Sequence, residues 1–310
     1  MHNLSPKSKA YAAAGFTIFI WATTYISTKM LLVDFTATEI TFFRFVIALA
    51  ALFLMQPKGI PFQNLREELL FAAAGLSGVT LYFMLQNLSL TYTLASNAAV
   101  LVSVAPFFIA ILSHFTLQGE PFRRQFFLGF LLAIAGIALI SFNGNFILKL
   151  SPLGDLLALT SAIAWASYSI ILKKLSAKGY QIVPFTRKIF FYGTLFLLPL
   201  LPLMDVRLGL DRFLRVQNLL NLLFLGLLAS ALCFVSWNFA VGVLGAVKTS
   251  VFIYLMPVIT VFFSVLILRE PLTWVAALGV ALIILGLAVS EGRLYGDKRH
   301  EGKSAPQAGE

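Results

Sequence analysis

The chain has few of the residues on which most catalytic and metal sites depend. Only 12% of its 310 residues are charged, and it contains one cysteine and three histidines. A single Cys233 cannot form a disulfide within the chain or supply a cysteine metal cluster. The sequence also lacks H-E-x-x-H, G-x-S-x-G, P-loop and G-x-G-x-x-G patterns. We therefore predict no catalytic residue, no metal and no cofactor.

Acidic residues are also scarce, and they lie in loops or near the ends of apolar segments. A proton-coupled pump usually keeps an ionisable group inside the membrane, and no carboxylate is predicted there. An intramembrane aspartyl protease needs two acids at mid-depth, whereas Asp155 falls at a predicted helix end without a partner. Basic residues give a net charge of +10 but form no run interleaved with aromatic residues. A nucleic-acid partner is therefore not expected.

Apolar residues make up most of the chain. They account for 59% of it, and the mean hydropathy is +0.90, values that indicate a membrane protein in contact with the lipid bilayer. Apolar stretches long enough to span a bilayer predict an all-α membrane protein with ten transmembrane helices. These helices are expected over 10–32, 36–55, 69–91, 94–117, 125–143, 153–174, 184–204, 217–241, 245–268 and 272–290.

The second half of the chain repeats the pattern of the first. The matching residues are Glu120/Glu270, Pro121/Pro271, Gly129/Gly279 and Gly136/Gly286 at an offset of 150, Asn87/Asn238 and Pro106/Pro257 at 151, and Trp21/Trp165 at 144. Arg44 roughly matches Arg187. An internal repeat predicts two copies of one unit, and in a membrane protein it points to a transporter with a central cavity near the bilayer midplane.

Five predicted helices per copy force the second copy to enter the membrane from the opposite side. The predicted units are a first repeat over 1–145, an inverted repeat over 146–290, and a polar, disordered cytoplasmic tail over 291–310. Cytoplasmic loops of membrane proteins are enriched in Lys and Arg. With both termini cytoplasmic, thirteen basic residues fall in inner segments and five in outer segments, the latter being Lys149, Arg207, Arg212, Arg215 and Arg269. This orientation is the predicted one.

These features together resemble the drug/metabolite transporter superfamily in its EamA branch. They are the repeat, a Trp in the first helix of each copy, a mid-helix Pro in the fourth, and Glu-Pro followed by two Gly. The aromatic residues of the central helices are similar to those of bacterial YddG-like aromatic amino-acid exporters. This resemblance implies export of amino acids and related small metabolites across the bacterial inner membrane without ATP.

Candidate substrate-binding residues are polar or aromatic and lie near the middle of predicted spans. They are Trp21, Thr24, Tyr25, Tyr82, Gln86, Ser103, Trp165, Tyr168, Trp237 and Tyr254. Trp and Tyr at this depth need hydrogen-bond partners that lipid cannot supply, which favours inward-facing positions. The alternative is an interfacial belt for the aromatic residues. For Asn87 and Asn238 the alternative is hydrogen bonding between helices.

Three further features have open alternatives. Pro106 and Pro257 are expected to kink the fourth and ninth helices, either as hinges or as fixed bends. Arg44 has Glu39 five residues earlier, so a structural ion pair is expected between them. The Gly pairs of the fifth and tenth helices are expected to allow close helix packing, with a homodimer face as the alternative to a monomer.

The sequence leaves three functional classes open. The favoured one is a carrier of a small-molecule substrate, an aromatic or other neutral amino acid, by alternating access through facilitated diffusion or exchange. Within the carrier class, a phosphorylated-metabolite or nucleotide-sugar antiporter is the runner-up, disfavoured because phosphates need several cationic partners. A nontransporting membrane scaffold or sensor subunit is the second class, and an intramembrane enzyme is the third.

Overall fold

The computed structural model describes residues 5–92, 98, 101–117, 124–142, 151–203, 209, 211–256, 258–259, 262 and 274–290, which contain helices and no strand. The helices of the first half are α1 (Pro6–Leu31), α2 (Ala37–Met55), α3 (Leu65–Gly75), the π-helix η1 (Leu76–Leu81), α4 (Tyr82–Tyr92), α6 (Ala105–Thr116) and α7 (Arg124–Phe142). Those of the second half are α8 (Pro152–Ser176), α9 (Ile182–Leu197), η2 (Leu198–Leu203), α10 (Asp211–Leu214), α11 (Val216–Leu223), the π-helix η3 (Phe224–Leu232), α12 (Cys233–Leu244), α13 (Ala246–Ser250), η4 (Val251–Tyr254) and α15 (Trp274–Ser290).

Helix starts follow local capping rules. The Ser5 hydroxyl accepts a bond from the Ser8 amide at the start of α1, and Thr36 with Glu39 forms a reciprocal capping box at the start of α2. Gly245, at φ +95°, ends α12 and allows α13 to begin at once. The predicted separation of the spans 217–241 and 245–268 is confirmed here.

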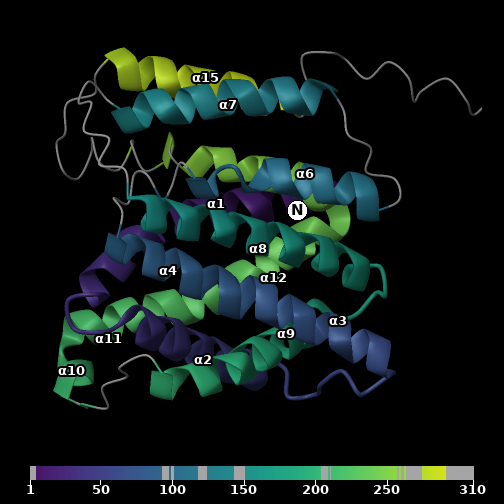
Figure 1. Ribbon diagram of the computed structural model, residues 1–310. Helices are drawn as coiled ribbons and strands as arrows, with labels where there is room; N and C mark the ends of the chain where they lie inside the picture. The colour runs from purple at the N-terminus through teal and green to yellow at the C-terminus, as the bar shows by residue number, and fades with distance from the viewer. Residues whose placement is uncertain are drawn as a thin grey trace, which may run out of the picture.

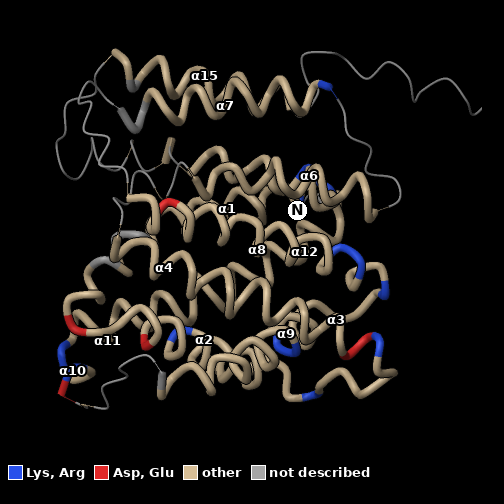
Figure 2. The backbone as a smooth tube through the Cα atoms, in the orientation of Figure 1, with Lys and Arg blue, Asp and Glu red and all other residues tan. Residues whose placement is uncertain are grey.

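Four helical segments in the described part of the chain are long and apolar enough to cross a membrane: Ala37–Met55, Leu65–Tyr92, Pro152–Ser176 and Val216–Leu244. Apart from Arg44 in the middle of α2, their charged residues lie toward the ends of the helices, and Figure 2 shows charged residues gathered near α10 and α11 on one side and near α3 on the other. This distribution fits a helical membrane protein.

Two of these segments contain a π-helical turn that the sequence did not predict. In each half, the third predicted span is one helix interrupted near its middle, by η1 in the first half and by η3 in the second. π-Helical turns shift the register of hydrogen bonds and are often found at functional sites. Both interruptions lie where a neighbouring helix comes close, since η1 packs on α8 and α9, and η3 packs on α2.

The predicted fourth span differs from the expectation of a kinked helix. The chain turns at Ser103 and Val104, and α6 then begins at Ala105 with Pro106 in its first turn. Proline suits this position because the first amides of a helix have no partner within it. The chain therefore breaks and restarts here instead of bending. Pro257 lies outside the described residues.

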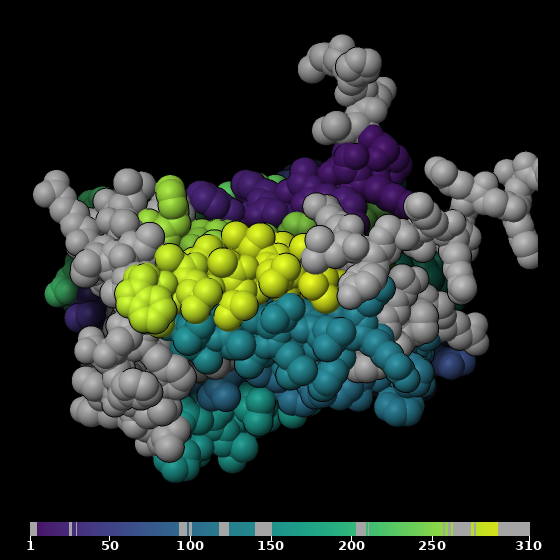
Figure 3. Space-filling model, turned by 90° about the horizontal axis from the view of Figure 1, so that it is seen from above, coloured from purple at the N-terminus to yellow at the C-terminus, as the bar shows by residue number. Residues whose placement is uncertain are grey.

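The halves interlock, because helices of one pack on helices of the other. α1 packs on α12, and α4 packs on α8, so the core forms between them (Figure 1). α7 and α15 lie side by side along one face, as Figures 1 and 3 both show. A Cβ added at Gly129 would lie 2.4 Å from the Gly286 carbonyl oxygen, so these helices touch through their glycines.

Candidate substrate cavity

A small central cavity lies between the two halves of the chain. Its walls come from α1, α2, α4 and α6 of the first half and from α8 and η4 of the second. The lining residues are Trp21, Thr24, Arg44, Tyr82, Phe83, Gln86, Val102, Ala105, Trp165, Ile253 and Met256. Its volume of about 40 Å³ holds on the order of two or three water molecules. The cavity must widen before it can hold an organic molecule.

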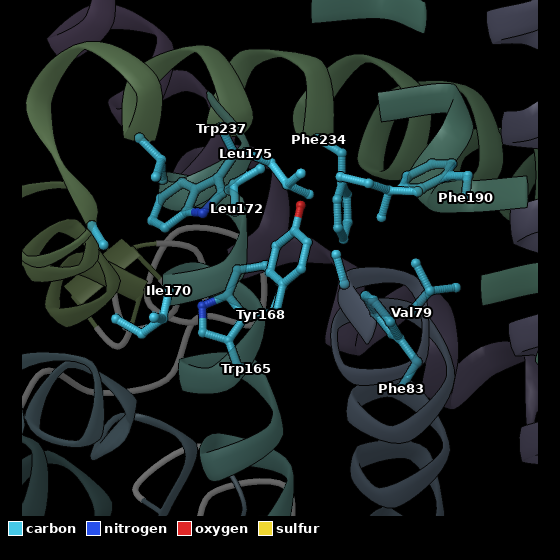
Figure 4. Close-up of a cluster of buried hydrophobic side chains, with 14 of the residues drawn as sticks. Val79, Phe83, Trp165, Tyr168, Ile170, Leu172, Leu175, Phe190, Phe234 and Trp237 are labelled. Atoms are coloured by element: carbon cyan, nitrogen blue, oxygen red, sulfur yellow. The ribbon is translucent and has the colours of Figure 1, made fainter. Parts of the chain in front are cut away.

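Aromatic rings form one side of this cavity. Trp21 and Trp165, from the first helix of each half, meet edge to face with ring centroids 5.4 Å apart, and Tyr82 lies 4.8 Å from Trp165. Trp237 packs behind Trp21 at 5.2 Å and does not line the cavity. The rings of Trp165, Tyr168, Phe234 and Trp237 form one cluster (Figure 4). Such a surface can stack an aromatic substrate.

The two tryptophans that meet in the cavity differ in their hydrogen bonding. The Trp21 indole N–H donates to the Ala229 carbonyl oxygen at 2.8 Å. The Trp165 indole N–H is buried and has no partner among the described residues. A buried donor without a partner costs about 1–3 kcal/mol, so Trp165 offers a donor that a bound molecule can use.

Arg44 on α2 also lines the cavity, and the expected ion pair with Glu39 does not form. Glu39 instead pairs with Arg212, whose guanidinium lies 3.0 Å from the carboxylate. Arg44 is only 3% exposed. Its Nε–H donates to the Ser230 hydroxyl at 2.9 Å, and its guanidinium lies 4.4 Å from the centroid of the Phe83 ring. In the described part of the chain, no carboxylate lies within ion-pair distance of it.

The structure brings five of the predicted site residues together: Trp21, Thr24, Tyr82, Gln86 and Trp165 all line the cavity. Val102 lines it in place of the adjacent Ser103, which is buried. Tyr254 is buried in a separate cluster with residues of α6 and α7. The side chain of Tyr25 lies outside the described residues.

Tyr168 and the two Asn residues hold helices together. The Tyr168 hydroxyl donates to Asn238 Oδ1 at 2.6 Å. Asn238 Nδ2 donates to the Thr186 hydroxyl at 3.0 Å, and Asn87 Nδ2 donates to the Thr41 hydroxyl at 2.9 Å. The two Asn–Thr bonds join the second and third helices of each half, and the Tyr168–Asn238 bond joins the first and third helices of the second half. Such bonds between helices are common for amides in an apolar environment.

A second, larger cavity is an open groove between α2 and α9 with a volume of about 850 Å³. Its walls are mainly apolar, and Arg187 and Lys188 lie at one edge. Lys188 forms an ion pair with Glu68, and Arg187 donates to the Gln56 carbonyl oxygen. The cations of α9 therefore have polar partners at the end of the bundle.

Polar contacts also join the two halves at both ends. At one end, Arg215 lies 2.8 Å from Asp34, and the hydrogen bond from Asn218, with the charge of Arg215, holds the pKa of Asp34 below its ordinary 3.8. At the other end, the Tyr180 hydroxyl donates to Glu67. Burial, together with this bond, raises the pKa of Tyr180 to about 12.

The model of the EamA-like transporter family matches residues 8–142 and 152–291, one match in each half. An uncharacterised transporter of Archaeoglobus fulgidus is 29% identical over 93% of this chain and 99% of its own length. A protein of Streptantibioticus cattleyicolor named a "probable terminal-alkyne amino-acid exporter" is 28% identical over 94% of this chain and 96% of its own.

A known crystal structure has the same fold. It shares 20% sequence identity with this chain, has a TM-score of 0.70, and is covered over 96% of its length by 91% of this chain. At this identity the likeness shows the fold alone. The family is shown by the match of the family model to both halves of the chain, and the aromatic cavity is seen in the structure itself.

Proposed function

Because the chain belongs to the EamA-like transporter family, we propose that it is a secondary transporter that exports aromatic and other neutral amino acids. The observation that carries this proposal is the central cavity, whose aromatic walls come from both halves of the chain. The similarity to a relative named as an amino-acid exporter supports it. The substrate and the lipid bilayer are the proposed partners.

The proposed mechanism is alternating access between two inverted five-helix repeats. Three observations support it: the equivalent Thr–Asn bonds in the two halves, the π-helical turn in each third helix, and the close contact of α7 with α15. The narrow cavity and the polar contacts at both ends correspond to a closed state. The break before α6 and the two π-helical turns are the proposed points of movement.

Transport by purified protein in proteoliposomes tests the function. Labelled phenylalanine should exchange across the bilayer, and Trp165→Ala should slow exchange by about tenfold, because one aromatic contact contributes about 0.5–1.5 kcal/mol. Trp274→Ala is the matched control, since Trp274 is 77% exposed on α15. No flux of any amino acid by the wild-type protein would exclude the proposed function.

The same vesicles test the coupling mode. No acidic residue is among the described residues that line the cavity, which supports exchange or facilitated diffusion over proton coupling. Net phenylalanine flux should follow the substrate gradient alone. Accumulation driven by an imposed pH gradient, with the membrane potential clamped, would contradict this mode.

A phosphorylated-metabolite antiporter is the weaker candidate. Arg44 is the one cation among the described lining residues, whereas a phosphate dianion is usually held by several.

For a bacterial inner-membrane exporter we propose that both termini are cytoplasmic. Tags at both ends should be accessible only after the cells are permeabilised, and labelling in intact cells would reverse this orientation.

A further inference from the structure

We infer that Arg44 binds the carboxylate of the substrate, and that the cavity recognises an aromatic monocarboxylate without needing its amino group. This inference rests on the proposed transport function and narrows the substrate class. It starts from a buried cation that faces the central cavity and has no carboxylate partner in the described part of the chain.

The contacts of Arg44 are too few for a buried charge. Its guanidinium uses its Nε–H on the Ser230 hydroxyl and lies over the Phe83 ring, and no other hydrogen bond joins it to described residues. A neutral hydroxyl and a ring face replace only part of the hydration that a buried ion loses. A guanidinium presents a planar fork of donors that matches a carboxylate. An anion entering the cavity would supply the missing partner.

Arg212, the other buried cation in the described part of the chain, already has such a partner, since it forms a two-point pair with Glu39. Lys188, which is partly buried, pairs with Glu68. Arg44 differs because it lies at the cavity instead of at an end of the bundle. An ionisable residue retained inside a membrane protein without a structural partner is a candidate for ligand binding.

The rest of the cavity wall determines what kind of anion fits. Trp165 adds a buried indole N–H without a partner in the described residues, and the rings of Trp21, Tyr82 and Phe83 surround the space beside Arg44. A guanidinium beside aromatic surfaces fits a carboxylate attached to an aromatic group by a short chain. A dianionic phosphate would leave one charge without a cation.

The described lining has no group that would require an amino group on the substrate. It contains no Asp or Glu, and its polar side chains besides Arg44 are neutral. A ligand ammonium would gain only neutral acceptors such as the Gln86 amide, and an amine without a carboxylate would place a second positive charge beside Arg44. Loss of the amino group should therefore be tolerated, while loss of the carboxylate should not.

A purely structural role for Arg44 makes a different prediction. In that case Arg44 would only anchor η3 to α2 through Ser230, near Gly226, where an added Cβ would lie 2.5 Å from Ile47. Its replacement would then weaken the fold without changing the relative affinity for two ligands of the same shape. Ligand preference therefore separates the two roles.

The test uses 3-phenylpropionate and 3-phenylpropanamide, which have the same shape and differ in charge. Binding to the purified full-length protein is followed by quenching of tryptophan fluorescence, with 2-phenylethylamine as a third probe. The wild-type protein should bind the propionate at least about tenfold more tightly than the amide, the range expected for a hydrogen bond to a charged group. Phenylalanine should bind like the propionate, and phenylethylamine should bind least.

Arg44→Gln should reduce the preference for the propionate to about equal affinity for the two ligands, because it removes the charge that distinguishes them. Arg44→Lys should keep part of the preference. Arg187→Gln, in the open groove between α2 and α9, should keep all of it. Equal binding of the two ligands by the wild-type protein would overturn the inference, and this comparison needs no variant to fold. An unchanged preference in Arg44→Gln would also overturn it.

Failure of the role of Arg44 can be distinguished from failure of the proposed transport function. Absence of transport with intact carboxylate preference would reject the carrier and leave the binding site. Phenylalanine transport by a protein that binds 3-phenylpropionate and 3-phenylpropanamide equally would leave the carrier and reject the role of Arg44.

Discussion

The corresponding turns of α2 and α9 share one feature and differ in another. In both, a Thr hydroxyl accepts a hydrogen bond from an Asn on the third helix of the same half, Asn87 to Thr41 and Asn238 to Thr186. A few residues later, α2 carries Arg44, which faces the central cavity. At this point α9 carries Arg187, the residue matched to Arg44 in the repeat, which donates to the Gln56 carbonyl oxygen, and Lys188, which pairs with Glu68.

This difference separates structural from functional residues. The Asn–Thr hydrogen bonds occur in both halves, where they join the second and third helices. They therefore stabilise the fold that the two halves share. The cations of α9 have polar partners at an end of the bundle, Gln56 for Arg187 and Glu68 for Lys188, whereas Arg44 faces the cavity and has no carboxylate partner among the described residues. We therefore infer that Arg44 has a role beyond the fold that the two halves share. A residue whose contacts differ between the two halves is therefore the best structural indication of the site in this chain.

Replacing Lys188 should lower the free energy of unfolding much more than replacing Arg44. Lys188→Met should lower the free energy of unfolding by about 3 kcal/mol, because it leaves Glu68 buried without its cation. Arg44→Met should change it by less than about 1 kcal/mol without ligand, because removing an unpaired buried charge offsets the lost contacts. Thermal unfolding in detergent checks both. Equal destabilisation would show that Arg44 is as structural as Lys188.

Replacing equivalent glycines of α7 and α15 by Ala should lower the free energy of unfolding by equal amounts. A Cβ at Gly136 would lie 2.5 Å from the Gly279 carbonyl oxygen, and one at Gly286 would lie 2.6 Å from the Gly129 carbonyl oxygen. Gly136→Ala and Gly286→Ala should each cost about 1–3 kcal/mol, since α7 and α15 must separate. Gly15→Ala is the control, because nothing lies within 4 Å of its added Cβ. Unequal losses would show that the two contacts are not equivalent.

Replacing Asn238 should cost more free energy of unfolding than replacing Asn87, because Asn238 has an additional partner. Asn87→Ala removes one bond to Thr41, at a cost of about 0.6 kcal/mol, an average value for such bonds in membranes. Asn238→Ala also leaves the buried Tyr168 hydroxyl without its acceptor, so the loss should be about twice as large. Thermal unfolding of Asn238→Ala alone and combined with Tyr168→Phe measures this excess. Additive effects in the double variant would contradict the shared bond.

The all-helical, membrane-spanning character of the fold was predictable from the sequence, because the length of apolar segments is a local signal, whereas the ten-helix inverted repeat stays a prediction. The family match at 8–142 and 152–291 confirms the predicted resemblance. The π-helical turns η1 and η3 were not predicted, because they depend on which neighbouring helix approaches. Their sequences, Leu76–Leu81 and Phe224–Leu232, each contain a Gly, but Gly is frequent in transmembrane helices and does not by itself predict a π-helical turn.

The site was predictable only in part. Trp21 and Trp165 were identified because they are equivalent in the repeat, and both line the cavity. Arg44 was assigned to Glu39 on spacing alone, although a position in the middle of an apolar span was the better signal. The apolar lining residues, such as Val102 and Ile253, could not be distinguished from packing residues. Depth can be read from hydropathy, but the direction of a side chain depends on tertiary contacts.

The smallest expected effects compare the two ends of the bundle, where the contacts are partly exposed and contribute little each. The pKa of Asp34 is lowered in the folded protein, so its contribution is present above about pH 4 and is lost as the pH falls through the lowered value. The pKa of Tyr180 is raised to about 12. Its contribution is therefore present below the ordinary value of 10.0 and is lost as the pH rises toward 12.

Single replacements at the two ends should therefore lose their effects at opposite extremes of pH. Asp34→Asn should lower the unfolding temperature by a degree or two at neutral pH, a small shift typical of an exposed ion pair, and should have no effect in acid well below pH 3.8. Tyr180→Phe should have its effect at neutral pH and lose it toward pH 12. The control condition is base, where Asp34→Asn should keep its effect because Asp34 and Arg215 both stay charged, whereas the Tyr180 hydroxyl loses the proton that it donates to Glu67. Loss of both effects toward pH 12 would contradict the assignment of separate contacts to the two ends.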